Sequence, residues 1–276
     1  MILLNPEKIQ AGIGSEIFLE VFESLDSTNT YLLNVEFNLQ HRVCLTEVQT
    51  AGRGRLGRSW ASSFGQNILL SYLYPYEKEI SSLNGLGLVI ATSVIRGLDL
   101  KNLKNKIQIK WPNDLYLDGK KMGGILIELK AGNRAQAKVA KTKVVIGVGL
   151  NINQILDADF SKDLSGREVS VLANNLENKA EFLDRNPLVI GVIKKIQEDL
   201  KIFEQKGLSY FLKIFDDLDY LKNKKISIKK HHLITQDSEI ISGLAQGIDE
   251  QGFLLILKNN GELEKFSAGD ASLTSF

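Results

Sequence analysis

"IQIKWPNDLYLDGKKMGGILIEL", residues 107–129, combines clear strand signals with a turn. Ile107 and Ile109 alternate with polar neighbours, which is the two-residue period of a half-buried strand. The dipeptide Asp118-Gly119 separates two strand-like runs and has the composition of a two-residue hairpin turn. The stretch therefore predicts a β-hairpin.

Further strands are predicted on both sides of this hairpin. Strand-like runs cover residues 42–50, 67–75 and 143–153. Pro75 is expected to end the second run, because proline cannot donate to a sheet.

Three helices are predicted around these strands. The first begins at Asp26 or Ser27, either of which can cap it. A buried helix is expected over residues 80–98. The third covers residues 187–206, because apolar side chains recur there at three- and four-residue steps and a glycine follows.

The character of the chain changes after about residue 221. Short strands separated by turns follow, which is typical of a small β-barrel or sandwich. The sequence therefore predicts a domain of residues 1–221 and an all-β domain of residues 222–276, in the α+β class.

Bulk composition excludes several classes of protein. The 276 residues are 43% hydrophobic and 24% charged, as in ordinary globular proteins. A net charge of +1 gives no field that would draw the protein to nucleic acid or an anionic membrane. Cys44 is the only cysteine, so no internal disulfide forms. The N-terminus has no secretory signal and residues 86–98 are too short to span a bilayer, so a cytoplasmic protein is expected.

The segment "TAGRGRLGRSW" (50–60) is a candidate ligand loop. Its three glycines let backbone N–H groups turn toward an anion, and its three arginines supply permanently charged donors for carboxylate or phosphate. It lacks the Lys-Ser/Thr pair of a P-loop. The composition alone fits a loop that folds over a ligand, and also a solvated basic loop or a weak RNA contact.

The segment "KWPND" (110–114) carries a second group of candidate residues. Lys110 is a cation at a strand end, while Asn113 and Asp114 offer oxygen ligands of the kind that Mg²⁺ accepts together with substrate phosphates. A capped turn beside a surface lysine is the alternative interpretation.

Glycines interrupt two of the strand-like runs. In "KKMGGILIE" (120–128) two lysines precede a glycine pair, and in "IGVGLN" (146–151) Gly147 and Gly149 share one face of the strand, with Asn151 following. Glycine within a strand indicates close approach of a ligand or of backbone. A bulge or tight helix–strand packing would explain both patterns without a ligand.

The remaining candidates are weaker. The three histidines have no metal-ligand spacing with cysteines or carboxylates, which argues against a zinc site. Cys44, Trp60 and Trp111 are expected to pack in the interior.

Taken together, these segments resemble the biotin–protein ligases. The resemblance rests on "DSTN" (26–29), "EVQTAGRGRLGRSW" (47–60), "KWPNDLYLDGKKMGGILIE" (110–128), "VVIGVGLNIN" (144–153) and "GFLLILKNNGELEKFSAGDASL" (252–273), which follow the order of the family. It implies a mixed sheet flanked by helices, akin to class II aminoacyl-tRNA synthetases, and a C-terminal SH3-like β-barrel.

The resemblance also implies a two-step reaction. Biotin and ATP, with Mg²⁺, give biotinyl-5′-AMP and pyrophosphate. A lysine of the biotin carboxyl carrier protein, the acceptor domain of a carboxylase such as acetyl-CoA carboxylase, then attacks the adenylate and AMP leaves. Members of the family can pair through the catalytic sheet, so a homodimer is one expectation.

Residue roles follow from the same resemblance. The catalytic positions are Lys121, which would lie at the reacting carboxylate, Arg55, which would retain the adenylate, and Lys110. The positions that match the biotin site are Ser27, Thr28, Gln49, Gly52, Arg53, Lys121, Gly124, Gly147 and Gly149. The positions that match the ATP or adenylate site are Arg55, Arg58, Trp60, Lys110, Asn113 and Asn151, with Asp114 at the magnesium position.

The chain departs from the family pattern in three places. Many bacterial members begin with a winged helix-turn-helix and act as repressors, whereas only 25 residues precede Asp26 here. A ligase that binds neither nucleic acid nor membrane is therefore expected. Thr274 stands where relatives often have arginine, and Asp270 stands where they have glutamate.

Three other functions remain open at this point. A lipoate–protein ligase shares the fold and the adenylation chemistry, although the glycine–arginine loop and "KWPND" favour biotin. An RNA-binding module would use stacking aromatics and a broad basic face, which the sequence lacks. A catalytically inactive biotin sensor would have no need of the lysines and Arg55.

Overall fold

The computed structural model describes residues 1–36, 40–100, 103, 106–131, 142–153, 168–176, 182–231 and 238–274. Its helices are α1 (Pro6–Ile13), α2 (Thr28–Asn34), α3 (Leu86–Leu98), α4 (Arg185–Lys206) and α5 (Leu212–Leu218). The strands of the first sheet are β1 (Ile17–Leu25), β2 (His41–Gln49), β3 (Asn67–Tyr76), β4 (Ile107–Lys110), β5 (Asp114–Leu117), β6 (Lys120–Ala131) and β7 (Thr142–Asn151). Those of the second sheet are β8 (Lys225–His231), β9 (Ser238–Ile248), β10 (Leu254–Leu257), β11 (Leu263–Phe266) and β12 (Ala271–Leu273).

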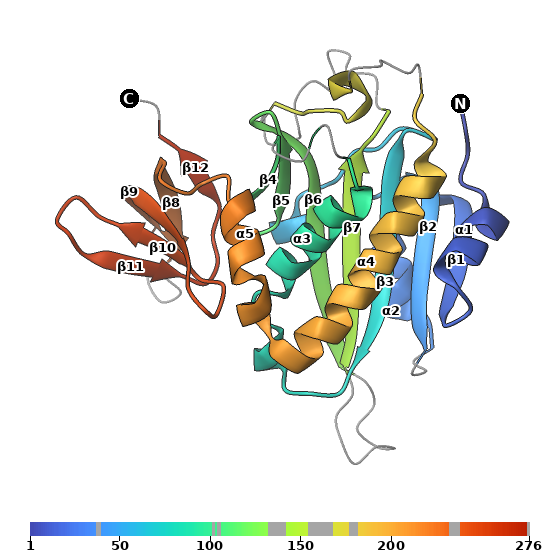
Figure 1. Cartoon of the computed structure of the whole chain (residues 1–276), viewed down its shortest axis with the longest axis horizontal. Coiled ribbons are helices and arrows are strands. Elements are labelled where there is room, and N and C mark those ends of the chain that lie inside the picture. The colour runs from blue at the N-terminus through green and yellow to red at the C-terminus, as the bar shows by residue number, and fades with distance from the viewer. Residues whose placement is uncertain are drawn as a thin grey trace.

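Two separate sheets organise the described part of the chain (Figure 1). The seven-stranded sheet has the order β1-β2-β3-β7-β6-β5-β4, and the five-stranded sheet has the order β11-β10-β9-β8-β12. Strands β1 and β2 are parallel, and all other neighbours are antiparallel. The predicted class, a mixed sheet with helices followed by an all-β part, is confirmed.

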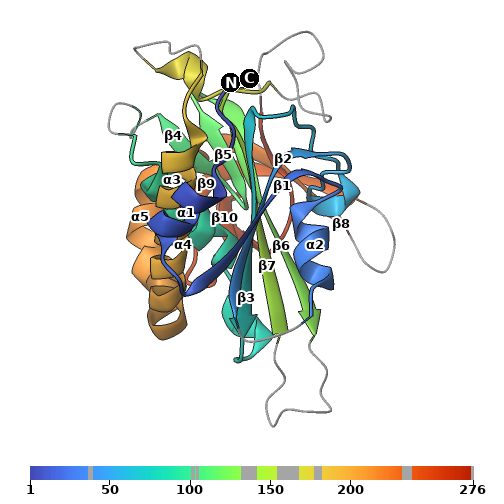
Figure 2. The ribbon, with the colours of Figure 1, turned by 90° about the vertical axis from the view of Figure 1, so that its right-hand side faces the viewer.

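The helices divide unequally between the two faces of the large sheet. Helices α1, α3, α4 and α5 lie on one face, and α2 lies alone on the other (Figure 2). The main hydrophobic core fills the space between the sheet and the four-helix face. A smaller cluster of Leu32, Cys44, Leu73 and Val145 lies under α2. Cys44 is a core residue, as predicted, and burial raises the pKa of its thiol.

Two of the predicted local signals are confirmed in detail. Ser27 is the N-cap of α2, where its hydroxyl accepts a hydrogen bond from the backbone N–H of Thr30 at 3.4 Å. The Asp118-Gly119 turn has φ values of 50° and 78°, and this pair of positive values is the geometry of a tight hairpin turn.

Two other expectations were wrong. Pro75 does not end β3, which continues to Tyr76. Pairing with β2 stops at Leu73, so the missing N–H of Pro75 breaks no bond to that strand. Residues 80–98 are not one helix, because Gly85 adopts a φ of 76° between a 3₁₀ turn (Ile80–Leu83) and α3.

The same segment is long and apolar enough to be considered as a membrane-spanning helix. Among the described residues, the span Ile80–Leu98 reaches a mean hydropathy of 1.3 over a helical window, of which half is buried inside the protein. Helix α3 packs against α4 and the large sheet, which is the place of a core helix.

Arg185 and Glu47 form an ion pair in the interior. The distance from Nη2 of Arg185 to Oε2 of Glu47 is 2.6 Å, and the side chains are 0% and 5% exposed. Arg185 also donates to the carbonyl oxygens of Asn67 and Ile2, and Glu47 accepts from the backbone N–H of Leu4. The pair therefore joins α4, β2, β3 and the N-terminal segment.

Replacing Arg185 with alanine should destabilise the protein by about 3–5 kcal/mol, because Glu47 would stay buried without its cation. Urea unfolding measures this free energy. Lys8→Ala is the matched control, since it removes the exposed ion pair with Asp184 and should cost less than about 1 kcal/mol. Equal costs for the two variants would contradict the prediction.

Candidate active site

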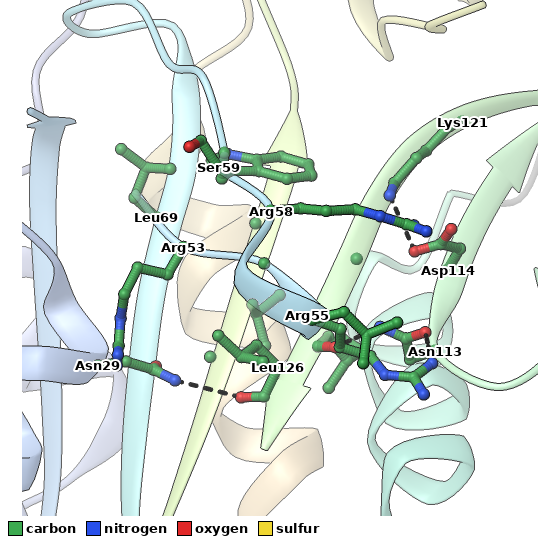
Figure 3. A pocket seen from close by; sticks show the side chains of 18 of the residues that line it. Asn29, Arg53, Arg55, Arg58, Ser59, Leu69, Asn113, Asp114, Lys121 and Leu126 are labelled. Atoms are coloured by element: carbon green, nitrogen blue, oxygen red, sulfur yellow. Dashed lines mark hydrogen bonds and ion pairs between the residues drawn. The ribbon is translucent and has the colours of Figure 1, made fainter. Parts of the chain in front are cut away.

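A cavity of about 460 Å³ lies on the α2 face of the large sheet (Figure 3). Its walls come from segments that are far apart in the sequence: the start of α2, the loop of residues 53–61, the turn of residues 111–114, strands β6 and β7, and the segment before β12. The segment that leads into β12 of the second sheet therefore contributes Gly269 and Asp270 to the same cavity.

The floor of the cavity follows from the register of two strands. Alternate residues of β3 and β7 point to the α2 face and form cross-strand pairs. From α2 outward these pairs are Leu73–Val145, Ser71–Gly147, Leu69–Gly149 and Asn67–Asn151. The first pair packs under α2, and the other three lie below the cavity.

Gly147 and Gly149 are glycines because other side chains occupy the space above them. A β-carbon on Gly147 would lie 2.5 Å from Oδ1 of Asn29, and one on Gly149 would lie 2.8 Å from the indole ring of Trp60. Their place on one face, predicted from the sequence, is confirmed. The glycines let α2 and the loop approach the sheet closely.

The glycine–arginine loop crosses the cavity and is held at three points. Each arginine contacts a different wall: Nη2 of Arg53 is 2.5 Å from Oε2 of Glu128 in β6, Nη1 of Arg55 is 2.9 Å from Oδ1 of Asn113, and Nη2 of Arg58 is 2.9 Å from Oδ2 of Asp270. Leu56, between them, has a φ of 55° and is 79% exposed. The loop thereby places its cations at the cavity by contacts with three separate elements.

A lysine–carboxylate pair lies opposite the loop. Nζ of Lys121 is 3.0 Å from Oδ1 of Asp114, and both side chains are 12% exposed. The same ammonium lies 5.8 Å from the ring of Trp60. Burial lowers the pKa of Arg55, while Asp114 and Asp270 act in the opposite direction. Arginine stays protonated at neutral pH despite such a shift, so Arg55 presents positive charge to the cavity beside the Lys121–Asp114 ion pair.

The structure brings most of the predicted site residues together, with two exceptions. Gly52 lines an adjoining groove on the other side of the loop, where a β-carbon would lie 2.4 Å from the carbonyl oxygen of Trp60. Lys110 is 5% exposed and lies behind the wall, with Nζ 3.3 Å from the Tyr116 hydroxyl and 4.0 Å from Oδ1 of Asp270. The cavity is lined by the other predicted residues, namely Ser27, Thr28, Gln49, Arg53, Arg55, Arg58, Trp60, Asn113, Asp114, Lys121, Gly124, Gly147, Gly149 and Asn151.

Trp60 was expected to be a packing residue on its local pattern, and it does cover Gly149. Its ring also lines the cavity, and its buried Nε1 has no hydrogen-bond partner among the described residues. An indole N–H beside a cavity is a donor for a ligand.

Sequence reasoning missed four polar residues at or behind this cavity. Asn29 lies in the motif "DSTN" (26–29), but the sequence alone indicated no role for it. Asp270 was noted only as a replacement for glutamate. Ser71 and Glu128 lie in strand-like runs, where a single polar side chain gives no distinguishing signal.

Family models match both parts of the chain. Residues 21–151 match the Biotin/lipoate A/B protein ligase family, and residues 232–274 match the Biotin protein ligase C terminal domain. The two matches follow each other in the order of the two sheets.

Individual relatives extend the similarity to nearly the whole chain. The bifunctional ligase/repressor BirA of Escherichia coli is 37% identical over 99% of this chain and 79% of its own length. The biotin–[acetyl-CoA-carboxylase] ligase of Mycobacterium tuberculosis is 28% identical over 97% of this chain and 92% of its own. The structure is also similar to the biotin protein ligase from Aquifex aeolicus in complex with biotin and ATP, with a TM-score of 0.74, 28% identity, and coverage of 93% of this chain and 98% of that one. The chain therefore belongs to the biotin protein ligases of the biotin/lipoate A/B protein ligase family.

Proposed function

We propose that this protein joins biotin to ATP as biotinyl-5′-AMP and then transfers the biotinyl group to a lysine of a biotin carboxyl carrier protein. The observation that carries the proposal is the convergence of Lys121, Arg55 and Arg58 on one cavity that also has a polar recess, formed by the buried Thr28 and the half-buried Gln49. Relatives support it: the Aquifex aeolicus structure is a complex with biotin and ATP, and two relatives are named biotin–[acetyl-CoA-carboxylase] ligases.

The cations of the cavity would offset the repulsion between the biotin carboxylate and the phosphates of ATP in the first step. A carboxylate that approaches a phosphate at 4 Å is repelled by roughly 4 kcal/mol at an effective dielectric of 20. We assign Lys121 to the reacting carboxylate and Arg55 and Arg58 to the phosphates, where fixed positive charges also stabilise the charge that develops on phosphorus. In this step an oxygen of biotin bonds to the α-phosphorus and pyrophosphate leaves.

The second step forms an amide. The acceptor lysine attacks the mixed anhydride, the bond to the phosphate oxygen breaks, and AMP leaves. Holding the adenylate under the loop favours this attack by proximity and excludes water. We assign the recess at Ser27, Thr28 and Gln49 to the ureido ring, and the part of the cavity at Trp60 and Asn151 to the adenine.

Magnesium fits the carboxylates of the cavity. Mg²⁺ is usually held by one or two carboxylates together with substrate phosphates, and Asp114 and Asp270 both line the cavity. No group of three His, Cys, Asp or Glu side chains that could hold a metal occurs in the described ranges. An ion brought with ATP would supply charge neutralisation at the phosphates, with Asp114 as its first protein ligand.

Residues 1–221 would form the catalytic domain and residues 222–276 the SH3-like domain, with Lys110 supporting Asp270 from behind the wall. The reaction would take place in the cytoplasm, without nucleic acid or membrane. Pairing of two copies through the catalytic sheet stays a prediction.

Biotin-dependent exchange of pyrophosphate into ATP tests the first step. Purified protein with Mg²⁺ should catalyse exchange with biotin, and lipoate serves as the parallel substrate. Exchange with lipoate alone would keep the chemistry and overturn the substrate. Absence of exchange with either acid, from folded protein, would overturn the proposed function.

Lys121→Ala should lower the rate of adenylate formation by about 10²–10³-fold, because it removes a positioned cation from the transition state. The measurement is the same exchange assay. Lys120→Ala is the matched control, since that neighbouring lysine is 50% exposed and pairs with Glu168. Near-normal exchange by Lys121→Ala would remove this lysine from the mechanism.

Arg55→Gly should release biotinyl-5′-AMP into solution, because the loop would lose its contact with Asn113 and its charge on the phosphate. Free adenylate labels lysines without selection, so biotin should appear on an added bystander protein. Arg42→Ala, which removes an arginine paired with Glu20 away from the cavity, should label the bystander no more than the unmodified protein does. Unchanged retention in Arg55→Gly would count against a role of the loop as a cover.

A further inference from the structure

A chain of hydrogen bonds leads from the rim of the site to the polar recess. Oε2 of Glu128 accepts from Nη2 of Arg53 at 2.5 Å and from Nδ2 of Asn29 at 2.9 Å. Oδ1 of Asn29 accepts from the Ser71 hydroxyl at 2.5 Å, and the hydroxyls of Ser71 and Thr28 are 2.7 Å apart. Thr28, the last member, lines the cavity, whereas Ser71 is fully buried behind it.

The first half of this chain has a fixed direction. The amide nitrogen of Asn29 faces the Glu128 carboxylate. It also faces the carbonyl oxygen of Leu126 at 3.3 Å, as the dashed line in Figure 3 shows. Both partners accept hydrogen bonds, so a flipped amide would set its oxygen against two acceptors. The oxygen of Asn29 therefore faces Ser71, and Arg53 holds the carboxylate in place.

The direction of the second half of the chain is set by the hydroxyl protons of Ser71 and Thr28. Ser71 has one hydroxyl proton, and Oδ1 of Asn29 can only accept it. The 2.7 Å contact between the two hydroxyls then uses the proton of Thr28. Oε1 of Gln49 is the other acceptor within reach of this hydroxyl, at the longer distance of 3.1 Å, and it also accepts the backbone N–H of Thr28 at 2.8 Å. Two hydroxyl oxygens 2.7 Å apart would repel without a proton between them, so the shorter contact with Ser71 keeps the Thr28 proton. The Thr28 proton thus points away from the cavity, and the hydroxyl offers a ligand its lone pairs.

We propose that Ser71 and Glu128 are positioning residues that act through Asn29 to make Thr28 a hydrogen-bond acceptor, and thereby select a ligand with an N–H donor at the recess. The inference rests on the proposed function, since the ureido ring of biotin carries N–H groups and the dithiolane ring of lipoate carries none. A site built to pair with a donor discriminates strongly against an analogue that lacks it, because its own polar group is left unpaired. The direction of this hydrogen-bond chain, called the relay below, would therefore favour biotin over lipoate at the recess.

The test compares two ligands on three proteins. Calorimetric titration of the full chain measures Kd for biotin and for biotin methylated at both ureido nitrogens. Ser71→Ala should shrink the preference for biotin by about tenfold, the order expected for one hydrogen bond to a buried group. Ser93→Ala is the matched control: this serine is equally buried and bonded to Asp199 in the four-helix layer, so its loss should leave the ratio unchanged.

A second variant tests the direction of the chain with little effect on packing. Glutamine at position 128 has the shape of glutamate but can also donate, so that Asn29 can flip and the proton order can reverse. Glu128→Gln should reduce the preference for biotin severalfold, even though loss of the Arg53 pair weakens both ligands alike. A wild-type ratio in either variant, from protein that still binds biotin, would overturn the relay alone. Unmodified protein that binds no biotin would overturn the proposed function.

Discussion

Close approach to one face of β7 is the constraint on which the site depends. Because Gly147 and Gly149 have no side chains, Asn29 and Trp60 rest directly on the sheet. Any β-carbon at either position would separate α2 and the loop from the strands. In each of the pairs Ser71–Gly147 and Leu69–Gly149, one partner has no side chain. This gap allows α2 to form the recess and the loop to cover it.

Charge is the second organising feature. The chain has a net charge of only +1, yet three arginines and Lys121 lie at one cavity. Each of these cations has an anionic or amide partner on another element, which limits their mutual repulsion and fixes their directions. Fixed cations of this kind are the preorganised environment that adenylate chemistry needs, since little reorganisation remains for the reaction itself.

Much of the site could be predicted from the sequence because its main signals are local. The spacing of two between Gly147 and Gly149 places both on one face, and the arginines of residues 53–58 share one short loop. Burial and direction were not predictable, since they depend on partners far along the chain. Lys110 contacts Tyr116 and Asp270. At Gly85, where the helix is interrupted, a β-carbon would lie 2.5 Å from a methyl group of Leu208, which is 123 positions further along the chain. Ser71 looks like any polar residue in a strand until Asn29 is placed beside it.

The contact between Arg58 and Asp270 joins residues that are 212 positions apart. At about 5–20 residues per second, ribosomes need on the order of 10–40 s to add that length of chain. A nascent polypeptide therefore contains its glycine–arginine loop well before it contains the carboxylate that ties this loop to the second sheet. The site is thus complete only after Asp270 has been added, and a chain that stalls before that point lacks one of the three attachments of its loop.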